Sequence, residues 1–580
     1  MRDQPNINAL WGALIVEELI RQGVERFVVA PGSRSAPLVA AVARSRATGT
    51  VWLDERGATF HALGLARGSG LPAAVITTSG TAVANLLPAV VEAAMDGVPL
   101  ILLTADRPPE LRDVGANQTI EQRGIFGTYL RWSFDLPCPD DRLPARMVLT
   151  AVDEAVRRAL RELGPVQLNC PFREPLAPDP APWDGTCLQG TNSWQASTAP
   201  FTLVEQRPGE PDADAVSAIA AVLARAQNGL LVTGVAAWDD RNAVQELAQT
   251  LGWPWVTDVR SQLRFGTAAP VHLPHLDRCF AADPERWVPD VVLQLGGSLT
   301  SKRLQTFLDR GDAGHQILID RRARRLDPGH RMTRRIDGDV GPWCEALGEA
   351  VAGRVKAPSM DRLRAVHQRL EGTMALAIDE GGALTEPWVA RWLTRHVRPD
   401  HALFLSSSLP VREVDDYGAL DGPPLRVAAN RGASGIDGVI ASAAGFACGS
   451  GRPCTLVIGD LALLHDLNGL AMLVEEIPTL TIVVLNNGGG GIFALLPIAE
   501  HEDVFSPLFD TPHAFRFDGV CRSFGLHYTR VETRSELEDA YSAAVTKGAH
   551  AVIEVASDMR ANRETHRRIE AALSEALDRS

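Results

Sequence analysis

Two apolar stretches near the C-terminus each end abruptly in polar residues and glycine. Residues 455–461 end around Asp460, and residues 481–493 contain Asn487 and a run of four glycines. Such runs are typical of buried parallel strands whose carboxyl ends open onto a ligand site. A crossover helix at about residues 466–475 fits between them, which would place both loops at one edge of a sheet. A carboxylate, an amide oxygen and exposed backbone N–H groups there suit a magnesium ion that holds a diphosphate.

The spacing of these two polar residues resembles a known cofactor signature. In the thiamine diphosphate motif, Gly-Asp-Gly is followed after about two dozen residues by Asn-Asn. Here Asn487 follows Asp460 by 27 positions, and Leu461 replaces the second glycine of the motif. A chance pair of this kind is common in a long chain. The assignment therefore depends on the strand context, the glycine run and a second feature elsewhere in the sequence.

That second feature is a carboxylate near the N-terminus. Thiamine chemistry needs a carboxylate that hydrogen-bonds the aminopyrimidine ring and favours the imino tautomer, which deprotonates the thiazolium carbon. Glu55 lies just past an apolar run at residues 50–53 and is a candidate for this role. The alternative is a surface carboxylate paired with its neighbour Arg56.

Apolar runs alternate with helical segments along the whole chain, which predicts an α/β fold of parallel sheets flanked by helices. Polar residues follow many of the runs, at the edge where such sheets bind ligands. A first helix is expected at residues 6–22, a surface linker at about 175–212 and helices at about 358–397. The predicted strands include residues 26–30, 50–53, 73–77, 100–103, 166–170, 229–233, 291–295, 316–320 and 551–555.

Composition narrows the functional class. A length of 580 residues predicts three or four domains. A net charge of −14 argues against a nucleic-acid surface. We expect no membrane span and a cytoplasmic protein, because no apolar run approaches about 18 residues and the N-terminus lacks a signal-peptide core. The eight cysteines show no zinc or disulfide pattern, and neither a P-loop nor a GxGxxG motif occurs.

Arginine supplies most of the positive charge. Only three of the 57 basic residues are lysine, so 54 are arginine. Coding bias or a salty habitat would explain this composition. The planar guanidinium group also suits carboxylates and phosphates, so arginines at predicted strand ends are candidate ligand-binding residues.

A resemblance to a known family lies in eight segments: residues 30–37, 54–57, 78–85, 103–111, 115–118, 430–438, 455–461 and 481–493. Together these segments closely resemble the menaquinone-pathway family of 2-succinyl-5-enolpyruvyl-6-hydroxy-3-cyclohexene-1-carboxylate synthases. Leu461 is normal in this family. The matching segments lie in all but the variable middle region, and they are far more specific than the metal motif alone.

The resemblance implies a three-domain thiamine diphosphate-dependent enzyme fold. The expected domains are a pyrimidine-binding domain at 1–185, a central α/β domain at 200–355 and a diphosphate- and metal-binding domain at 375–575. The active site would form between the first domain of one subunit and the third domain of another. A homodimer is then the minimum unit, and a homotetramer is the alternative.

The resemblance also implies roles for individual residues. Asp460, Asn487 and the carbonyl of Gly489 would bind Mg²⁺ or Mn²⁺. Ile436 would bend the cofactor, although plain core packing would also explain an apolar residue there. The full set of cofactor-binding residues would be Glu55, Ser408, Ile436, Gly459, Asp460, Leu461, Asn487, Gly489, Ile492 and Phe493, with Glu55 catalytic. The substrate-binding residues would be Ser33, Arg34, Arg107, Gln118, Lys302, Arg303, Ser408, Arg412 and Arg431.

The implied reaction is decarboxylation of 2-oxoglutarate and conjugate addition of the succinyl carbanion to isochorismate, in menaquinone or phylloquinone biosynthesis. Both substrates are small dicarboxylates, which arginines can fix through charge-assisted contacts. One alternative is another thiamine-dependent carboligase or decarboxylase of the acetolactate-synthase type. Another is a catalytically silent thiamine-fold subunit. No histidine is assigned as a base, and His61 and His465 are expected to be structural or solvent-facing.

Overall fold

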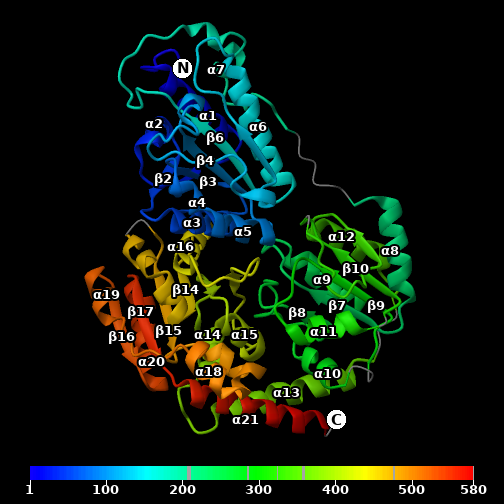
Figure 1. The fold of residues 1–580 in the computed structure, drawn as a ribbon. Coiled ribbons are helices and arrows are strands. Elements are labelled where there is room, and N and C mark those ends of the chain that lie inside the picture. Colours follow the sequence, from blue (N-terminus) through cyan, green and yellow to red (C-terminus); the bar gives the residue numbers. More distant parts are fainter. Residues whose placement is uncertain are drawn as a thin grey trace. The chain divides into compact units, whose positions relative to one another are not determined.

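The structure is a computed structural model that describes residues 1–204, 211–283, 287–311, 313–322, 324–355, 359–474 and 477–578. The chain forms two compact units. The first consists of Met1–Gln206, Asn430–Cys454 and Ala462–Leu480, and the second of Arg207–Ala429, Thr455–Leu461 and Thr481–Ser580. Three parallel sheets flanked by helices confirm the predicted α/β class (Figure 1).

The first sheet has the strand order β2-β1-β3-β4-β6-β5, and its paired strands run parallel. Helices α1, α2 and α6 bury apolar side chains against one face. Helices α3 and α5 lie on the other face, where the alternate strand residues point. The bounds are β1 (Arg26–Val29), β2 (Thr48–Val51), β3 (Ala73–Thr77), β4 (Leu100–Asp106), β5 (Trp132–Asp135), β6 (Pro165–Pro171), α1 (Ile7–Arg21), α2 (Ala36–Ala43), α3 (Glu55–Ser69), α5 (Leu87–Asp96) and α6 (Ala145–Arg161).

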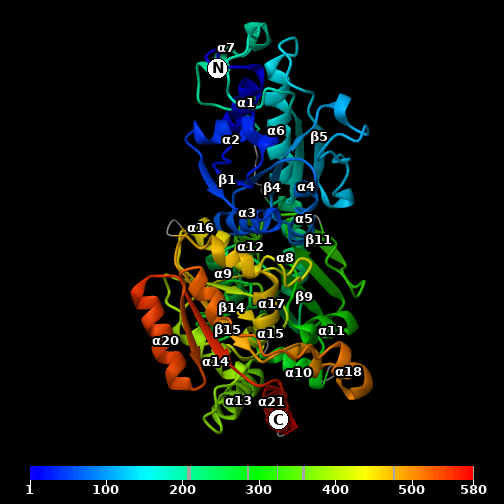
Figure 2. The same ribbon diagram turned by 60° about the vertical axis from the view of Figure 1, so that its left-hand side comes forward.

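Glycine allows α3 to lie very close to α16 (Val439–Ser450), a helix of the same unit that comes from much later in the chain (Figures 1 and 2). A Cβ atom at Gly64 would lie 2.1 Å from the carbonyl oxygen of Ser442, and one at Gly445 would lie 2.0 Å from that of His61. Gly68 and Gly449 repeat the pattern one turn later. Backbone-to-backbone packing of this kind fixes the position of α3, whose first residue is Glu55.

The central sheet has the order β11-β10-β9-β7-β8, and its neighbouring strands also run parallel. Helices α8, α9 and α12 bury apolar side chains against one face, and α10 and α11 against the other. The bounds are β7 (Gly229–Thr233), β8 (Trp255–Thr257), β9 (Val291–Leu295), β10 (His315–Ile319), β11 (Arg334–Ile336), α8 (Ala213–Arg225), α9 (Arg241–Leu251), α10 (Leu276–Ala282), α11 (Lys302–Arg310) and α12 (Val340–Val351).

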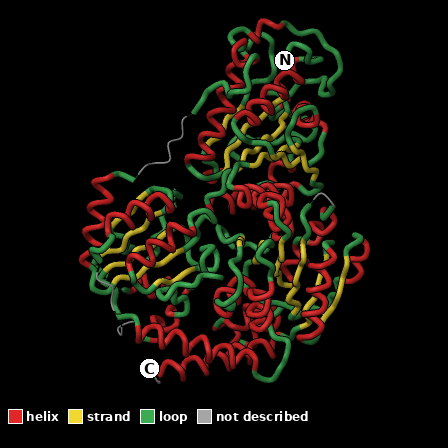
Figure 3. The backbone as a smooth tube through the Cα atoms, turned by 180° about the vertical axis from the view of Figure 1, so that it is seen from behind, coloured by secondary structure: helices red, strands yellow, loops and turns green. Residues whose placement is uncertain are grey.

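The third sheet has the order β13-β12-β14-β15-β17-β16, which puts the two strands of the metal motif side by side. Helices α13 and α21 lie beside each other in the same unit, and the tube view shows strands layered between helices (Figure 3). The bounds are β12 (Ala402–Leu405), β13 (Arg426–Ala429), β14 (Cys454–Gly459), β15 (Leu480–Asn486), β16 (His527–Val531), β17 (Ala551–Ala556), α13 (Asp361–Asp379), α14 (Glu386–His396), α15 (Leu409–Tyr417), α20 (Arg534–Lys547) and α21 (Met559–Asp578). Short helices are α4 (Thr81–Ala84), α7 (Asn192–Gln195), α17 (Asp460–His465), α18 (Glu502–Leu508) and α19 (Asp518–Ser523).

Most predicted elements are present, and the differences have local causes. The expected strand at 50–53 lies two residues earlier, as β2. Strands β5, β8, β11 and β16 had no clear sequence signal, because all are short edge strands of three to five residues. The domain limits 1–185, 200–355 and 375–575 remain predictions. No helix in the described part of the chain is long and apolar enough to cross a membrane.

The predicted crossover helix at 466–475 is wrong. Helix α17 begins at Asp460 itself, and a 3₁₀ helix follows at Leu467–Met472. A carboxylate is favourable in the first turn of a helix, where backbone N–H groups are unpaired. The end of the predicted helix, Glu475, lies outside the described residues.

We expect acid to destabilise the protein through His61, a residue of α3 that stacks on Trp52 with ring centroids 4.5 Å apart. Complete burial lowers the pKa of His61 to about 4, so folding favours the neutral ring. This stabilisation is fully present above the unfolded pKa of about 6.5 and is lost as the pH falls toward 4. The free energy of unfolding of the wild type should fall by up to about 3 kcal/mol relative to His61→Phe over that range.

Urea unfolding at each pH measures this difference. The control is His527→Phe, because His527 is exposed on β16 and the substitution should leave the wild-type pH dependence unchanged. A constant difference between wild type and His61→Phe from pH 7 to pH 4 would contradict the assignment.

Candidate active site

The carboxylate of Asp460 organises the loops at the ends of β14 and β15. Its Oδ1 atom accepts the backbone N–H of Leu461 at 2.7 Å. Its Oδ2 atom accepts the N–H groups of Gly488 and Gly489 at 2.9 and 3.1 Å. Burial raises the pKa of Asp460 above its ordinary value, and these N–H groups partly offset that effect. A nearby cation would stabilise the ionised form further.

Three of the four glycines beside Asp460, Gly489, Gly490 and Gly491, have no room for a Cβ atom. Gly489 has φ of 157°, and a Cβ atom there would lie 2.4 Å from the carbonyl oxygen of Asp510. A Cβ atom at Gly491 would lie 2.5 Å from Nδ2 of Asn487. The backbone of this loop can therefore approach a diphosphate closely, as the sequence predicts.

Asn487 is oriented with its oxygen free for a ligand. Its Nδ2 atom donates to Oε1 of Glu386 at 3.0 Å. Its Oδ1 atom is buried and has no hydrogen-bond partner among the described residues. A buried unpaired acceptor costs about 1–3 kcal/mol, which a bound cation would offset. One carboxylate and one amide oxygen therefore fit a Mg²⁺ ion that takes its remaining ligands from a diphosphate and water.

A histidine that the sequence did not reveal lies against this site. Nε2 of His513 is 3.2 Å from Oδ2 of Asp460, and the ring stacks on Phe515. The backbone N–H of His513 donates to the carbonyl of Gly488, which holds the loop beside the glycine run. No motif marks His513, because only the tertiary fold brings its loop to Asp460.

Glu55 is the first residue of α3 and is half-buried. Asp54 caps the helix by accepting the backbone N–H of Arg56 at 3.1 Å. The Nδ2 atom of Asn85 lies 3.4 Å from Oε2 of Glu55. Arg56 makes ion pairs with Asp54 and Asp466 rather than with Glu55. The alternative of a simple Glu55–Arg56 surface pair therefore has no support in this geometry.

Two predicted substrate arginines lie near each other at the carboxyl edge of the first sheet. Arg34 is buried, and burial followed by the charge of Arg107 lowers its pKa. Nη1 of Arg34 donates to the carbonyl of Phe172 at 2.9 Å, and Nη2 lies 3.2 Å from the exposed carboxylate of Glu174. The predicted residue Ser33 is exposed beside Arg34. Two neighbouring, largely buried guanidinium groups favour an anionic ligand.

Gln118 belongs to the same cluster. Its Nε2 atom donates to the carbonyl of Ser79 at 3.0 Å, and the hydroxyl of Ser79 accepts Nη1 of Arg107 at 2.7 Å. Gln118 has φ of 54°, and its side chain would lie 2.9 Å from a Cβ atom at Gly80. The structure thus brings together the four predicted substrate-binding residues of this unit that precede residue 120, which are Ser33, Arg34, Arg107 and Gln118.

Buried acids hold the loop that carries Arg431 and Ile436. The carboxylate of Glu92 accepts the backbone N–H groups of Gly432 and Ala433 at 2.8 and 2.6 Å. Arg67 donates to Oδ1 of Asn430 at 2.6 Å and to Asp96 at 2.8 Å. Burial, followed by the charge of Asp96, raises the pKa of Glu92. Ile436 is half-exposed, so it is not an ordinary core residue.

The remaining predicted arginines lie in the second unit and line a cavity of about 620 Å³. Arg412 donates to the carbonyl of Ser408, which has φ of 74°. Burial lowers the pKa of Arg303, but the carboxylates of Asp416 and Asp277 outweigh this effect and raise it. Lys302 is exposed and does not line the cavity.

Several of the predicted cofactor-binding residues lie beside the glycine run or beside Asp460 and are partly exposed. Ile492 and Phe493 are half-buried, as Gly459 and Leu461 are beside Asp460. The ring of Phe493 packs edge-on against Phe509 with centroids 5.5 Å apart. Partial exposure leaves these apolar side chains available to a cofactor.

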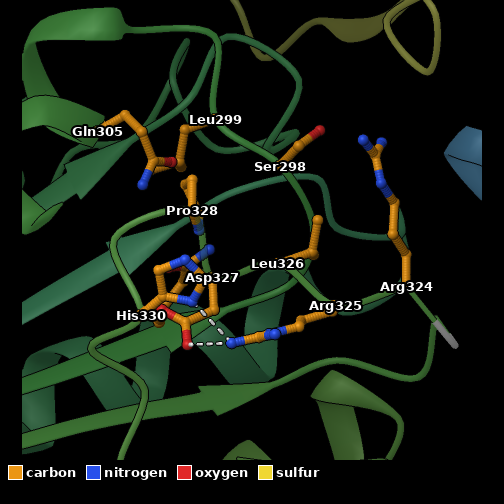
Figure 4. Close-up of a pocket in the computed structure, with 10 residues that line it drawn as sticks. Ser298, Leu299, Gln305, Arg324, Arg325, Leu326, Asp327, Pro328 and His330 are labelled. Carbon is orange, nitrogen blue, oxygen red and sulfur yellow. Dashed lines mark hydrogen bonds and ion pairs between the residues drawn. The ribbon is translucent and has the colours of Figure 1, made fainter.

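A separate pocket of about 300 Å³ lies where loops follow β9 and β10 of the central sheet (Figure 4). Arg325 points toward His330, with a hydrogen bond of 2.8 Å, and lies 3.9 Å from Asp327. Ser298 and Leu299 also line the pocket, as does Gln305 of α11. None of the predicted substrate residues lines this pocket, so it is not part of the candidate active site.

Family models for thiamine pyrophosphate enzymes match most of the chain. They are the N-terminal TPP binding domain at residues 11–125, the middle domain at 185–405 and the C-terminal TPP binding domain at 421–555. The metal loops fall in the last of these segments and Glu55 in the first. The chain therefore has a thiamine diphosphate enzyme fold and uses thiamine diphosphate.

Curated relatives match nearly the whole chain. A 2-succinyl-5-enolpyruvyl-6-hydroxy-3-cyclohexene-1-carboxylate synthase of Rubrobacter xylanophilus is 49% identical, covering 98% of this chain and 99% of its own. One of Salinibacter ruber is 44% identical, covering 99% and 98%. The chloroplastic protein PHYLLO of Arabidopsis thaliana is 40% identical over 100% of this chain and 36% of its own length.

A solved structure from Mycobacterium smegmatis, described as a thiamin diphosphate-dependent enzyme, has a similar fold. Its TM-score is 0.68 with 19% sequence identity, covering 94% of this chain and 99% of that one. At this identity the likeness concerns the fold alone.

We expect Asp460→Ala to weaken Mg²⁺-dependent binding of thiamine diphosphate by more than about 100-fold. The substitution removes both a candidate metal ligand and the acceptor that holds the glycine loop. Calorimetric titration of the purified protein with thiamine diphosphate, with and without Mg²⁺, measures the change. Asp503→Ala, at an exposed position of the same unit, is the matched control. Unchanged affinity in Asp460→Ala would exclude the metal assignment.

Proposed function

The chain belongs to the 2-succinyl-5-enolpyruvyl-6-hydroxy-3-cyclohexene-1-carboxylate synthase family, and from this we propose that it decarboxylates 2-oxoglutarate and adds the succinyl unit to isochorismate. It is a thiamine diphosphate-dependent enzyme that forms a carbon–carbon bond. The proposed product is the compound for which the family is named, an intermediate of menaquinone or phylloquinone synthesis.

One observation supports the proposal that the substrates are dicarboxylates. Arg34 and Arg107 lie close together, largely buried, at the edge of the first sheet. The exposed carboxylate of Glu174 lies 3.2 Å from Arg34, and the other nearby carboxylate, that of the buried Asp106, is shared with Arg112. Burying two cations is costly unless an anion compensates for them. A dicarboxylate substrate would supply that anion, and bidentate contacts would fix its position.

The residues of the second unit supply the other half of the proposed binding set. Arg412 and Arg303 line one cavity, and the buried carboxylates beside Arg303 hold its guanidinium in place. We propose that Ser33, Gln118, Lys302, Ser408 and Arg431 complete the substrate contacts. Two dicarboxylate substrates need several cationic groups to fix their carboxylates.

Glu55 has the proposed proton-transfer role. When bound, thiamine diphosphate supplies an acidic thiazolium carbon and an electron sink. Glu55 would hydrogen-bond the pyrimidine nitrogen and hold the proton that favours the imino tautomer. Asn85 would keep the Glu55 carboxylate in position. Asp460, Asn487 and the Gly489 carbonyl would hold Mg²⁺ or Mn²⁺ against the diphosphate.

We further propose a homodimer or homotetramer in the cytoplasm, with each active site built from two subunits. Exposed apolar side chains near Glu55 support this assembly. Val51 and Leu53, just before Glu55, are 54% and 72% exposed. Large apolar side chains beside a catalytic carboxylate favour burial by another part of the assembled enzyme.

An assay with purified protein tests the proposed reaction directly. The mixture contains 2-oxoglutarate, isochorismate, Mg²⁺ and thiamine diphosphate, and mass spectrometry follows product formation. We expect a carbon–carbon bonded product and release of CO₂ that depends on both the metal and the cofactor. Turnover of pyruvate alone would instead indicate a carboligase of the acetolactate-synthase type.

We expect Glu55→Gln to keep the fold and lower turnover by about 10²–10⁴-fold, because the amide cannot exchange a proton with the cofactor ring. Steady-state rates at saturating substrates measure the effect, and thermal unfolding confirms that the fold is intact. Glu25→Gln, at an exposed carboxylate of the same unit, should retain wild-type rates. Near-normal turnover in Glu55→Gln would remove the proposed role.

A further inference from the structure

A second buried carboxylate contacts the proposed metal ligand from behind. Glu386 is the first residue of α14 and is 1% exposed. Its Oε1 atom accepts Nδ2 of Asn487 at 3.0 Å and the hydroxyl of Ser557 at 2.9 Å. The first contact spans 101 positions of the sequence and the second spans 171. No motif in the sequence marks this residue.

The contact determines which end of the Asn487 amide faces the metal loop. An amide side chain carries two N–H donors at one end and an acceptor oxygen at the other. The Oε1 acceptor of Glu386 can pair only with the N–H end, so Oδ1 of Asn487 must point away from it. That oxygen is buried and has no hydrogen-bond partner among the described residues. The amide is thus held in the orientation that a cation needs.

Two neighbours restrict movement of this pair. The Ser557 hydroxyl donates to the same oxygen of Glu386, which fixes the carboxylate at the end of β17. The absence of a side chain at Gly491 lets its backbone lie against Asn487, where a Cβ atom would come within 2.5 Å of Nδ2. A rotation that turned Nδ2 toward the metal loop would leave Oδ1 facing the carboxylate, with no donor for Oε1 except Ser557.

We propose that Glu386 is a positioning residue for the cation, which acts by holding Asn487 with its Oδ1 atom toward the metal site. It does not touch the metal, the cofactor or the substrate in this arrangement. Groups that orient metal ligands from outside the coordination sphere typically affect affinity by about 10–100-fold. The proposal rests on the metal ligands proposed above, which the Asp460→Ala measurement tests separately.

The test compares variants that keep or remove the acceptor. Glu386→Met has similar volume but cannot accept a hydrogen bond, and Glu386→Asp keeps a carboxylate that is one carbon shorter. Glu386→Gln keeps an acceptor oxygen at the original reach. Ser557→Ala removes only the neighbouring donor. Thiamine diphosphate is titrated into each apoprotein at several fixed Mg²⁺ concentrations, and tryptophan fluorescence gives the apparent Mg²⁺ dissociation constant.

We expect Glu386→Met and Glu386→Asp to weaken Mg²⁺ binding by about 10–100-fold, and Glu386→Gln and Ser557→Ala to stay within about 3-fold of the wild type. Thermal unfolding of each apoprotein separates this effect from stability. Wild-type Mg²⁺ affinity in Glu386→Met, or in Glu386→Asp if the Met variant does not fold, would overturn the proposal. A loss of Mg²⁺ affinity in Glu386→Gln equal to that in Glu386→Met would also overturn it. That result would assign the effect to the negative charge of Glu386 rather than to its acceptor oxygen.

Discussion

The hydrogen bonds to the buried carboxylate of Asp460 are the interaction on which the architecture of the candidate metal site depends. This carboxylate accepts three backbone N–H groups, one from its own helix and two from the loop after the neighbouring strand β15. These contacts bring the ends of β14 and β15 together and hold the glycine run in place. The N–H groups of both loops point at the Asp460 carboxylate, which is shielded from solvent. The loops therefore have the arrangement that binds this carboxylate before any cofactor is present.

The free-energy cost of burying charged side chains explains much of the remaining structure around the candidate site. The enzyme buries cationic side chains such as Arg34 and Arg107 and acidic ones such as Glu92 and Glu386 near the predicted ligand-binding loops. Glu92 accepts backbone N–H groups and so holds the loop that carries Arg431. Glu386 accepts the side-chain N–H of Asn487, the proposed metal ligand, and holds it in place. The arginines have fewer neutralising partners, as expected where an anionic substrate supplies the missing charge.

The position of Glu55 depends on packing rather than on charge. Helix α3 can begin at Glu55 in a fixed place because its glycines let α16 approach backbone to backbone. A side chain at Gly64 or Gly445 would push the two helices apart and move the first turn of α3. The proposed role of Glu55 requires its carboxylate to be placed to within about an ångström, so this close packing would affect activity directly.

The sequence by itself determined the chemistry and the class of fold. Glu55, Asp460, Asn487 and the glycine run lie in short local segments, and apolar periodicity identified most of the buried strands. These signals are readable because a buried parallel strand and the loop that follows it are contiguous in the chain. Short edge strands such as β5 and β16 were not predicted, because few of their side chains are buried and they show no apolar pattern.

Only the tertiary structure decided which residues support those groups. Asn487 meets Glu386, Asp460 meets His513, and the loop of Arg431 meets Glu92 across at least 50 positions of sequence. Each partner looks like an ordinary surface or helix residue in its own segment. Their roles arise from long-range packing and from the need to pair every buried polar group, and neither constraint leaves a local pattern in the sequence.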